Sequence, residues 1–466
     1  MLNLKAKKQV KSKAKQQKAT SEERLNSVVV DDLLERQTET ERNELVRELI
    51  SYKRISLPFL FILCCLTCFG LVMLYSSGFI QSYLDSDTGS LQTLIIKQLG
   101  LSLIGVVAAG VIALAININW LNKAFLAHLG WIVTTFLLVA VIFFGQVRNG
   151  ANRWLSIGGI DFQPSEIAKF MTVYFLAVYF ADAKKRLPLH RLKQARNSHI
   201  YRRLVKRYSF YYIVKPAVMI GIWLGLIVFQ PHLSCTVIIV LLSLAVFVVA
   251  GIPKAIWLSG LWRLFLITLA LILLAMCILP FAKGESLGDF LNKHFSHVKT
   301  RAEIYSESDQ DTQNDQNYQI IQARRALGSG GLTGVGLGES RQKFNFLPSI
   351  HNDYIFSGIG EELGFIGCMA IILLFIALFM VGLSIAIRAD NIYASLLAWG
   401  YSFLLFVQAL LNIAVATEVI PATGISLPFF SYGGTANIVF LIEAGIVLAV
   451  SRCSLHVGKT VKELLA

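Results

Sequence analysis

The chain has 466 residues, of which 55% are hydrophobic and only 15% are charged. A soluble domain carries about a quarter charged residues, so this composition excludes an ordinary soluble protein and indicates a membrane protein. The formal net charge of +14 would suit a nucleic acid, but the basic residues gather in two segments beside apolar runs. That distribution indicates orientation in a membrane, and we expect no nucleic-acid partner.

Residues 1–54 are predicted to form a cytoplasmic arm that is partly disordered. The first 18 residues contain seven Lys and no acid, and a mixed-charge segment with weak helical periodicity follows. Lysines of this kind attract anionic lipid, so we expect contact with the membrane surface. No cleaved signal peptide is expected, because the first apolar run begins only after this charged stretch.

Apolar runs long enough to cross about 30 Å of hydrocarbon, which takes roughly 20 residues each, recur along most of the chain. A backbone in lipid must satisfy its own hydrogen bonds, and continuous apolarity excludes the alternating pattern of a barrel. The sequence therefore predicts an all-α, polytopic bundle of about ten membrane helices. The expected spans are 57–77, 92–117, 123–145, 163–183, 210–230, 233–251, 259–282, 353–388, 394–417 and 436–452.

The orientation of these spans follows from the basic residues between them. Residues 184–208 carry ten Lys or Arg and no acid, which predicts a cytoplasmic loop. With ten spans, both termini are then cytoplasmic, including a short tail at 456–466. The membrane domain covers 55–455, and a large polar loop at 283–350, between the seventh and eighth spans, lies outside the membrane.

The start of the fourth span combines charges with a helix start. Glu166 and Lys169 are three residues apart, so they share one helix face and neutralise each other. A structural ion pair and a functional pair are both open readings. Pro164 predicts the helix start, and Arg148 and Arg153 lie just before it. Two arginines, a lysine and a helix N-terminus at one depth would suit a phosphate group.

The loop at 283–350 begins with an acidic window that contains Asp309, Asp311 and Asp315. By composition it is a linker, a weak cation site, or the carrier of one catalytic carboxylate. The glycines between 328 and 338 lack the context of a nucleotide-binding loop. They are expected to permit tight turns and a short re-entrant helix that lines a cavity.

Further polar residues lie in or beside apolar runs. His351 and Asp353 open the eighth span, Glu361 and Glu362 follow within it, and the breaks between 421 and 434 favour a polar vestibule. Two other pairs, Asn412 with Gln408 and Asn437 with Glu443, are interpreted as contacts between helices. All seven cysteines lie in or beside apolar runs, so no disulfide framework is expected.

Three segments resemble the signatures of the SEDS (shape, elongation, division, sporulation) family. They are NGANRWLSIGGIDFQPSEIAKF, GSGGLTGVGLGESRQKFNFLPSIHNDYIFSGIGEELGFIG and TGISLPFFSYGGT. The resemblance covers residues 57–452. The chain is similar to the division-type member, because GLGESRQKFNFLP is compact where elongation-type members carry extra residues. One departure is His232, which stands where many relatives carry an acid.

The resemblance implies a peptidoglycan glycosyltransferase that polymerises lipid II outside the membrane, releases undecaprenyl pyrophosphate and inverts the anomeric centre. The essential loop aspartate of the family corresponds to Asp311 as general base, by its distance from Arg301 and from Tyr318–Gln319. The local pattern departs by one residue, which leaves Asp309 and Asp315 as alternatives. The family also implies a substrate cavity lined by Arg153, Glu166, Lys169, His351, Asp353, Glu361 and Ser431.

The expected partners, by the same resemblance, are a class B penicillin-binding protein of the FtsI type and other division proteins at the septum. No cofactor is assigned, although a divalent cation, Mg or Mn, is open. Two other functions remain as alternatives: a lipid II flippase, and an elongation-type, RodA-like polymerase. The acidic outer loop favours chemistry over transport, because a flippase needs no general base there.

Overall fold

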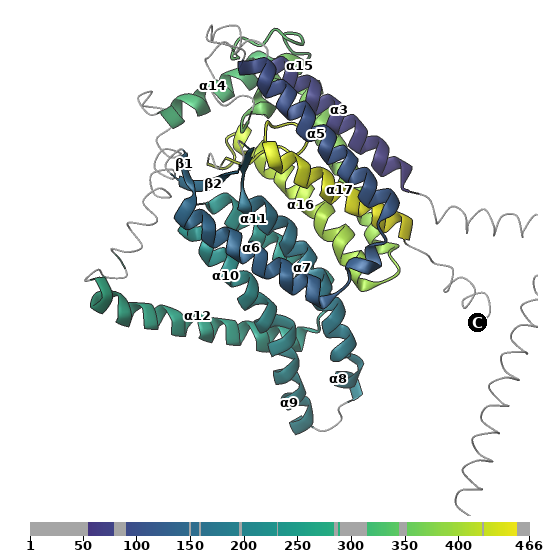
Figure 1. Cartoon of the computed structure of the whole chain (residues 1–466), viewed down its shortest axis with the longest axis vertical. Helices are drawn as coiled ribbons and strands as arrows, with labels where there is room; N and C mark the ends of the chain where they lie inside the picture. The colour runs from purple at the N-terminus through teal and green to yellow at the C-terminus, as the bar shows by residue number, and fades with distance from the viewer. Residues whose placement is uncertain are drawn as a thin grey trace, which may run out of the picture. The chain divides into compact units, whose positions relative to one another are not determined.

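The computed structural model describes residues 55–78, 90–148, 151–157, 160–194, 198–230, 232–283, 288, 315–343, 352–421 and 424–453. These residues are mostly helical (Figure 1). The helices are α3 Leu57–Gly78, α5 Ser90–Ala115, α6 Ala124–Phe144, α7 Pro164–Arg186, α8 His190–Gln194, α9 Ser198–Ser209, α10 Lys215–Phe229, α11 Leu233–Val249, α12 Lys254–Lys283, α14 Asp315–Ser329, α15 Ile355–Ile387, α16 Ile392–Ala416 and α17 Gly434–Cys453. A 3-10 turn covers Ile118–Leu121, and a π-turn at Phe210–Val214 joins α9 to α10.

Every expected span overlaps one of these helices, and the span at 210–230 overlaps the π-helical segment and α10 together. Among the described residues, seven helical segments are long and apolar enough to cross a membrane: α3, α5, α6, the joined α9 and α10, α15, α16 and α17. Their lipid-facing side is visible in α6, where Phe136 and Phe143 are 70% and 75% exposed. Large exposed apolar side chains of this kind are expected where the solvent is lipid. Crossing by α7, α11 and α12 stays a prediction.

The interior is formed by α7, α16 and α17. About 72% of the α17 span and 67% of the α16 span are buried, against 22% for α6. Helix α7 packs against α6, α10, α11, α16 and α17, and α17 also runs along α5 (Figure 1). Polar residues on α7, α16 and α17 therefore lie where protein, not lipid, surrounds them.

The helix ends that were predicted to be cytoplasmic lie together. Arg452, at the end of α17, donates from Nη2 to the Ile116 carbonyl after α5, at 2.8 Å. Asn391, before α16, donates to the Asn119 side chain at 3.1 Å. These contacts involve the ends of the predicted spans 92–117 and 436–452 and the start of the span 394–417. Spans that alternate in direction along the chain would place these three ends on the same side of the membrane.

A small antiparallel sheet joins α6 to α7 where a short outer loop was expected. Its strands are β1 Gln146–Arg148, β2 Ala151–Ile157 and β3 Ile160–Phe162, in the order β1-β2-β3. Strand β2 contacts α6 and α7, and β3 contacts α17. The sheet gives Arg153 a fixed place on β2 next to the start of α7.

Helix α15 is not the continuous eighth span that the sequence predicted. It breaks at Gly364, whose φ of 65° and ψ of −164° lie outside the helical region. The break leaves backbone N–H and C=O groups without helical partners, and the glycine-rich segment after α14 forms hydrogen bonds with them. The Val335 amide donates to the Glu361 carbonyl at 2.9 Å, and the Phe365 amide donates to the Gly331 carbonyl at 2.9 Å.

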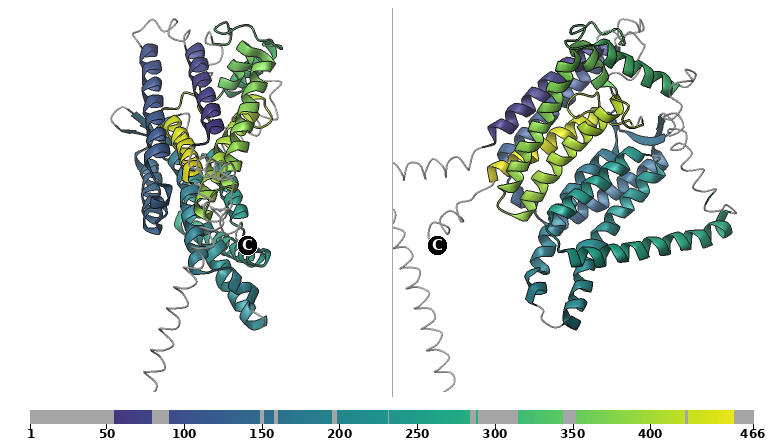
Figure 2. Two further views of the ribbon diagram at one scale, coloured as in Figure 1. Left: turned by 90° about the vertical axis from the view of Figure 1, so that its right-hand side faces the viewer. Right: turned by 180° about the vertical axis from the view of Figure 1, so that it is seen from behind.

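Glycine is required where this segment meets α15. A Cβ at Gly330 would clash with the carbonyl of Gly360, and a Cβ at Gly334 would clash with the carbonyl of Glu362. Helix α14 itself packs on α15 and α16, next to this junction (Figure 2). The prediction that these glycines permit tight turns is confirmed, and their reason is close backbone approach.

Candidate active site

The predicted pair of Glu166 and Lys169 forms a buried ion pair at the start of α7. Lys169 Nζ lies 2.7 Å from Glu166 Oε2, and the side chains are 4% and 8% exposed. The pair is held by local geometry, because Pro164 occupies the first turn of α7 and residues three apart share a helix face. The predicted helix start and the predicted ion pair are both confirmed.

Other charges lie close to this pair. Cys235 on α11 donates from Sγ to the Ser165 carbonyl at 3.6 Å. Cys235 is within electrostatic reach of Lys169, Glu166 and Arg153, so the structure brings Arg153 into the same neighbourhood. Two cations, Lys169 and Arg153, therefore lie near a helix N-terminus. Such a place favours an anionic group such as a phosphate.

Glu443 on α17 belongs to the same cluster of charges. Its side chain is buried, and it lies within electrostatic reach of both Lys169 and Glu166. Its Oε2 atom has no hydrogen-bond partner among the described residues. The sequence interpretation of Glu443 as a contact between helices is therefore incomplete. Periodicity alone gives no signal that α17 brings a further charge to α7.

The segment before α15, which carries Asp353, contacts the segment between α16 and α17, which carries Ser431. The Ser431 hydroxyl donates to the Asn352 carbonyl at 2.7 Å and accepts from the Leu427 amide at 2.7 Å. Asn412 on α16 donates to the Asp353 carbonyl at 2.9 Å. Asn412 therefore joins separate segments, as its interpretation as a contact residue predicted.

Glu361 lies just before the break in α15, and its carboxylate is directed at the loop after α14. Oε1 accepts from the Arg341 amide at 2.9 Å, and Oε2 accepts from the Gln342 amide at 3.4 Å and from the Ser340 hydroxyl. The contacts of Glu361 thus hold a backbone segment. Its predicted place in the substrate cavity stays a prediction.

The other predicted site residues lie outside the described residues or at their edge. Asp311, Asp309 and His351 are outside, and Asp315 is the first residue of α14. In the part of the chain that the structure describes, no group of three or more His, Cys, Asp or Glu could hold a metal ion. The acidic window that includes Asp311 is not in that part, so the divalent cation stays an open expectation. Five cysteines are free thiols: Cys64, Cys65, Cys68, Cys235 and Cys368.

Known proteins with similar sequences match most of this chain. The family model described as "Cell cycle protein", for FtsW, RodA and SpoVE, matches residues 57–456. A probable peptidoglycan glycosyltransferase FtsW of Geobacter sp. (strain M18) is 31% identical over 391 residues, which are 83% of this chain and 94% of the relative. Stage V sporulation protein E of Bacillus subtilis (strain 168) is 32% identical over 83% of this chain and 93% of its own length.

Solved structures show the same fold. One, from work on the coordination of polymerization and crosslinking by a peptidoglycan synthase complex, aligns with a TM-score of 0.58 at 23% identity, over 86% of this chain and 99% of the other. The Thermus thermophilus rod shape determining protein RodA aligns with a TM-score of 0.55 at 22% identity, over 86% of this chain and 97% of the other. The helical bundle, the ordered motifs and the family match over most of the chain lead to one conclusion: this protein belongs to the FtsW/RodA/SpoVE family of cell cycle proteins.

Proposed function

We propose that this protein is a division-type peptidoglycan glycosyltransferase that polymerises lipid II. The observation that carries the proposal is the buried Glu166–Lys169 pair at the start of α7, a helix that contacts the strand carrying Arg153. The chain's similar relatives include proteins named FtsW. Charge is expensive inside a membrane protein, and two cations near a helix N-terminus suit a pyrophosphate.

The proposed reaction joins two sugar chains carried on lipid pyrophosphates. The acceptor 4-hydroxyl attacks the anomeric carbon of the donor, and its proton passes to a carboxylate, which we assign to Asp311. The bond from that carbon to the pyrophosphate oxygen breaks, so the carbon inverts. Lys169 and Arg153 stabilise the negative charge that grows on the leaving pyrophosphate.

The test is polymerisation of purified lipid II by the purified chain together with a partner transpeptidase. We expect wild type to form glycan polymer and Asp311→Ala to abolish it while its expression and folding are unchanged. Asp309→Ala and Asp315→Ala are matched controls, since each removes one carboxylate from the same window. Polymer from Asp311→Ala, with none from one of the controls, would move the base to that residue.

Transport is the second outcome of the same experiment. Absence of polymer from wild type, combined with protein-dependent movement of lipid II across vesicle membranes, would favour the flippase. The acidic loop would then have no role as a base.

The partner and location follow from the same family. A relative in fold comes from a peptidoglycan synthase complex that coordinates polymerization and crosslinking, which supports a transpeptidase partner of the class B penicillin-binding type. We propose that this membrane protein acts with such a partner and with other division proteins at the septum. Co-purification with the candidate transpeptidase tests the pairing, and its failure in membranes that contain both proteins would contradict it.

A further inference from the structure

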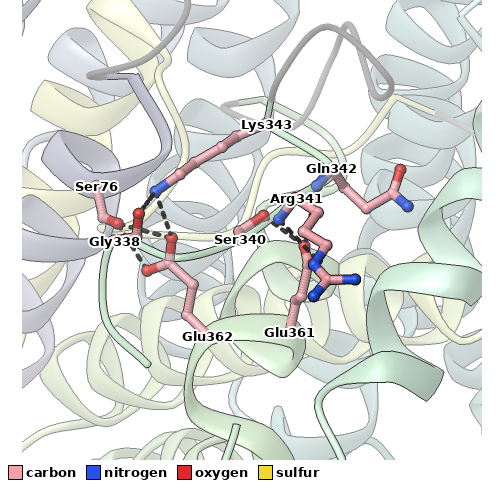
Figure 3. A network of polar contacts seen from close by, with 8 residues as sticks. All are labelled: Ser76, Gly338, Ser340, Arg341, Gln342, Lys343, Glu361 and Glu362. Atoms are coloured by element: carbon pink, nitrogen blue, oxygen red, sulfur yellow. Dashed lines mark hydrogen bonds and ion pairs between the residues drawn. The ribbon is translucent and has the colours of Figure 1, made fainter. Parts of the chain in front are cut away.

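Two adjacent glutamates, Glu361 and Glu362, are the centre of a buried polar network (Figure 3). Glu362 accepts from the Ser76 hydroxyl, at 2.7 Å to Oε1 and 2.6 Å to Oε2. Lys343 Nζ lies 3.2 Å from Glu362 Oε1, and the side chains of this pair are 1% and 2% exposed. Lys343 also donates to the Gly338 carbonyl. We call Ser76, Gly338, Ser340, Lys343, Glu361 and Glu362 the Glu361–Glu362 network.

The network holds the chain between Gly338 and Lys343 at both ends. Glu361 bonds the backbone and hydroxyl in the middle of that segment, and Lys343 closes it by reaching back to Gly338. The preceding turn is already bonded to the break in α15 through the Val335 amide. The segment therefore has few ways to move independently of α15.

The energetics indicate what such a network is for. Burying an ion pair costs desolvation, so a Lys–Glu pair gains little stability over well-packed apolar residues of the same size. A buried network whose groups are all hydrogen-bonded instead fixes one geometry, because every alternative leaves a polar group unpaired. The pair of Lys343 and Glu362 is thus better explained by a role in positioning the segment than by a contribution to the stability of the fold.

Helix α3 enters the network from the other end of the sequence. Ser76 lies near the end of α3, 286 residues before Glu362. The same helix also supports the segment that carries Ser431: a Cβ at Gly70 would clash with the Phe429 carbonyl, and the rings of Phe69 and Phe430 are 5.8 Å apart. Helix α3 is therefore in contact with the segment that carries Ser431 and with Glu362, the neighbour of Glu361. Ser431 and Glu361 are both predicted to line the substrate cavity.

We propose that Ser76, Lys343 and Glu362 are positioning residues, which hold the segment 336–343 and α3 in one arrangement on the broken helix α15. Their action on the reaction is indirect and rests on the proposed glycosyltransferase function. Their action on the segment does not rest on that function, because hydrogen exchange of the segment's amides measures it directly.

The test uses the full chain with Lys343→Met, Glu362→Gln and the double variant Lys343→Met/Glu362→Gln. Each is measured for melting temperature, for hydrogen exchange in peptides covering 335–343, and for kcat and KM with lipid II. The matched control is Arg186→Met, which removes the exposed pair with Asp182, at 72% and 37% exposure and 2.8 Å. We expect the control to leave all three measurements unchanged.

Each single variant leaves a buried charge without its partner, so we expect both melting temperatures to fall. The double variant leaves no unpaired charge, and we expect its melting temperature to return toward wild type. Its segment should still exchange about tenfold faster, because the bonds from Lys343 are gone. We expect kcat to fall about tenfold with KM within about twofold, since the lost contacts act on geometry.

Wild-type exchange and wild-type kcat in the double variant would overturn the proposal, because the pair would then only fill space. Faster exchange with wild-type kcat would overturn it as well, since the order of the segment would not matter to the reaction. Ser76→Ala tests the link to α3: unchanged exchange in the segment would remove α3 from the proposal. If wild type forms no polymer, the proposed function fails, while the exchange data still decide whether the network holds the segment.

Discussion

Lys169 lies between charges from two helices. Glu166, on its own helix, is 2.7 Å away, and Glu443 approaches from α17. Replacing this buried lysine therefore changes the charge balance around both carboxylates. A substitution at Lys169 is therefore the most direct test of the candidate chemistry.

Replacing Lys169 should act on the transition state. We expect Lys169→Met to lower kcat/KM for lipid II by about 10²–10³, the range found when one group that stabilises developing charge is removed. The variant also leaves Glu166 buried without its cation, which alone destabilises the protein.

The double variant Lys169→Met/Glu166→Gln separates the two effects. It should recover the melting temperature and not the rate. A double variant with wild-type kcat/KM would show that the ion pair is only structural, the other reading that the sequence left open.

At the scale of elements, the break in α15 decides where its polar end lies. The part of α15 before Gly364 carries Glu361 and Glu362, and the apolar part follows it. The continuous helix after the break, 365–387, is therefore shorter than the predicted span of 353–388. Both glutamates come before the break instead of within a continuous helix, and their buried carboxylates find partners in the loop.

Gly364 is the residue on which this break depends. We expect Gly364→Ala to destabilise the protein by about 1–3 kcal/mol, because only glycine tolerates this backbone conformation readily. An added Cβ would also meet the backbone of Gly334. Thermal unfolding in detergent measures the change.

Gly221→Ala on α10 is the matched control, since nothing lies within 4 Å of its Cβ. It should be neutral or slightly stabilising, as alanine favours a helix. Equal melting temperatures for the two variants would contradict the requirement for glycine at position 364.

At the scale of the whole molecule, the family match covers 57–456 and the described helices lie between Leu57 and Cys453, whereas the basic arm precedes both. Deleting residues 1–50 should leave lipid II polymerisation within about twofold of wild type, since no residue of the proposed site lies in the arm.

We expect the same deletion to weaken localisation to the septum, if the lysines contact lipid or division proteins in the cytoplasm. Fluorescence microscopy of the tagged chain measures this, with replacement of the seven lysines by glutamine as the control for charge. Normal septal localisation after the deletion would end the proposal of a targeting role for the arm.

The sequence by itself determined the helical bundle, because a backbone surrounded by lipid has few alternatives to a helix, and the expected spans match the helices to within a few residues at most ends. It also determined the Glu166–Lys169 pair, since residues three apart meet through the helix alone. The three motifs likewise identify the family without the fold.

Only the tertiary structure decided which distant groups meet. Ser76, Lys343 and Glu362 come from segments far apart in the chain, and nothing in their spacing pairs them. Packing of α17 and of the small sheet on α7 brings Glu443 and Arg153 into the electrostatic neighbourhood of the ion pair, which local periodicity does not encode. The break at Gly364 could not be predicted for the same reason. An apolar run predicts only burial in lipid, whereas the hydrogen-bond partners of the backbone at a break come from elsewhere in the chain.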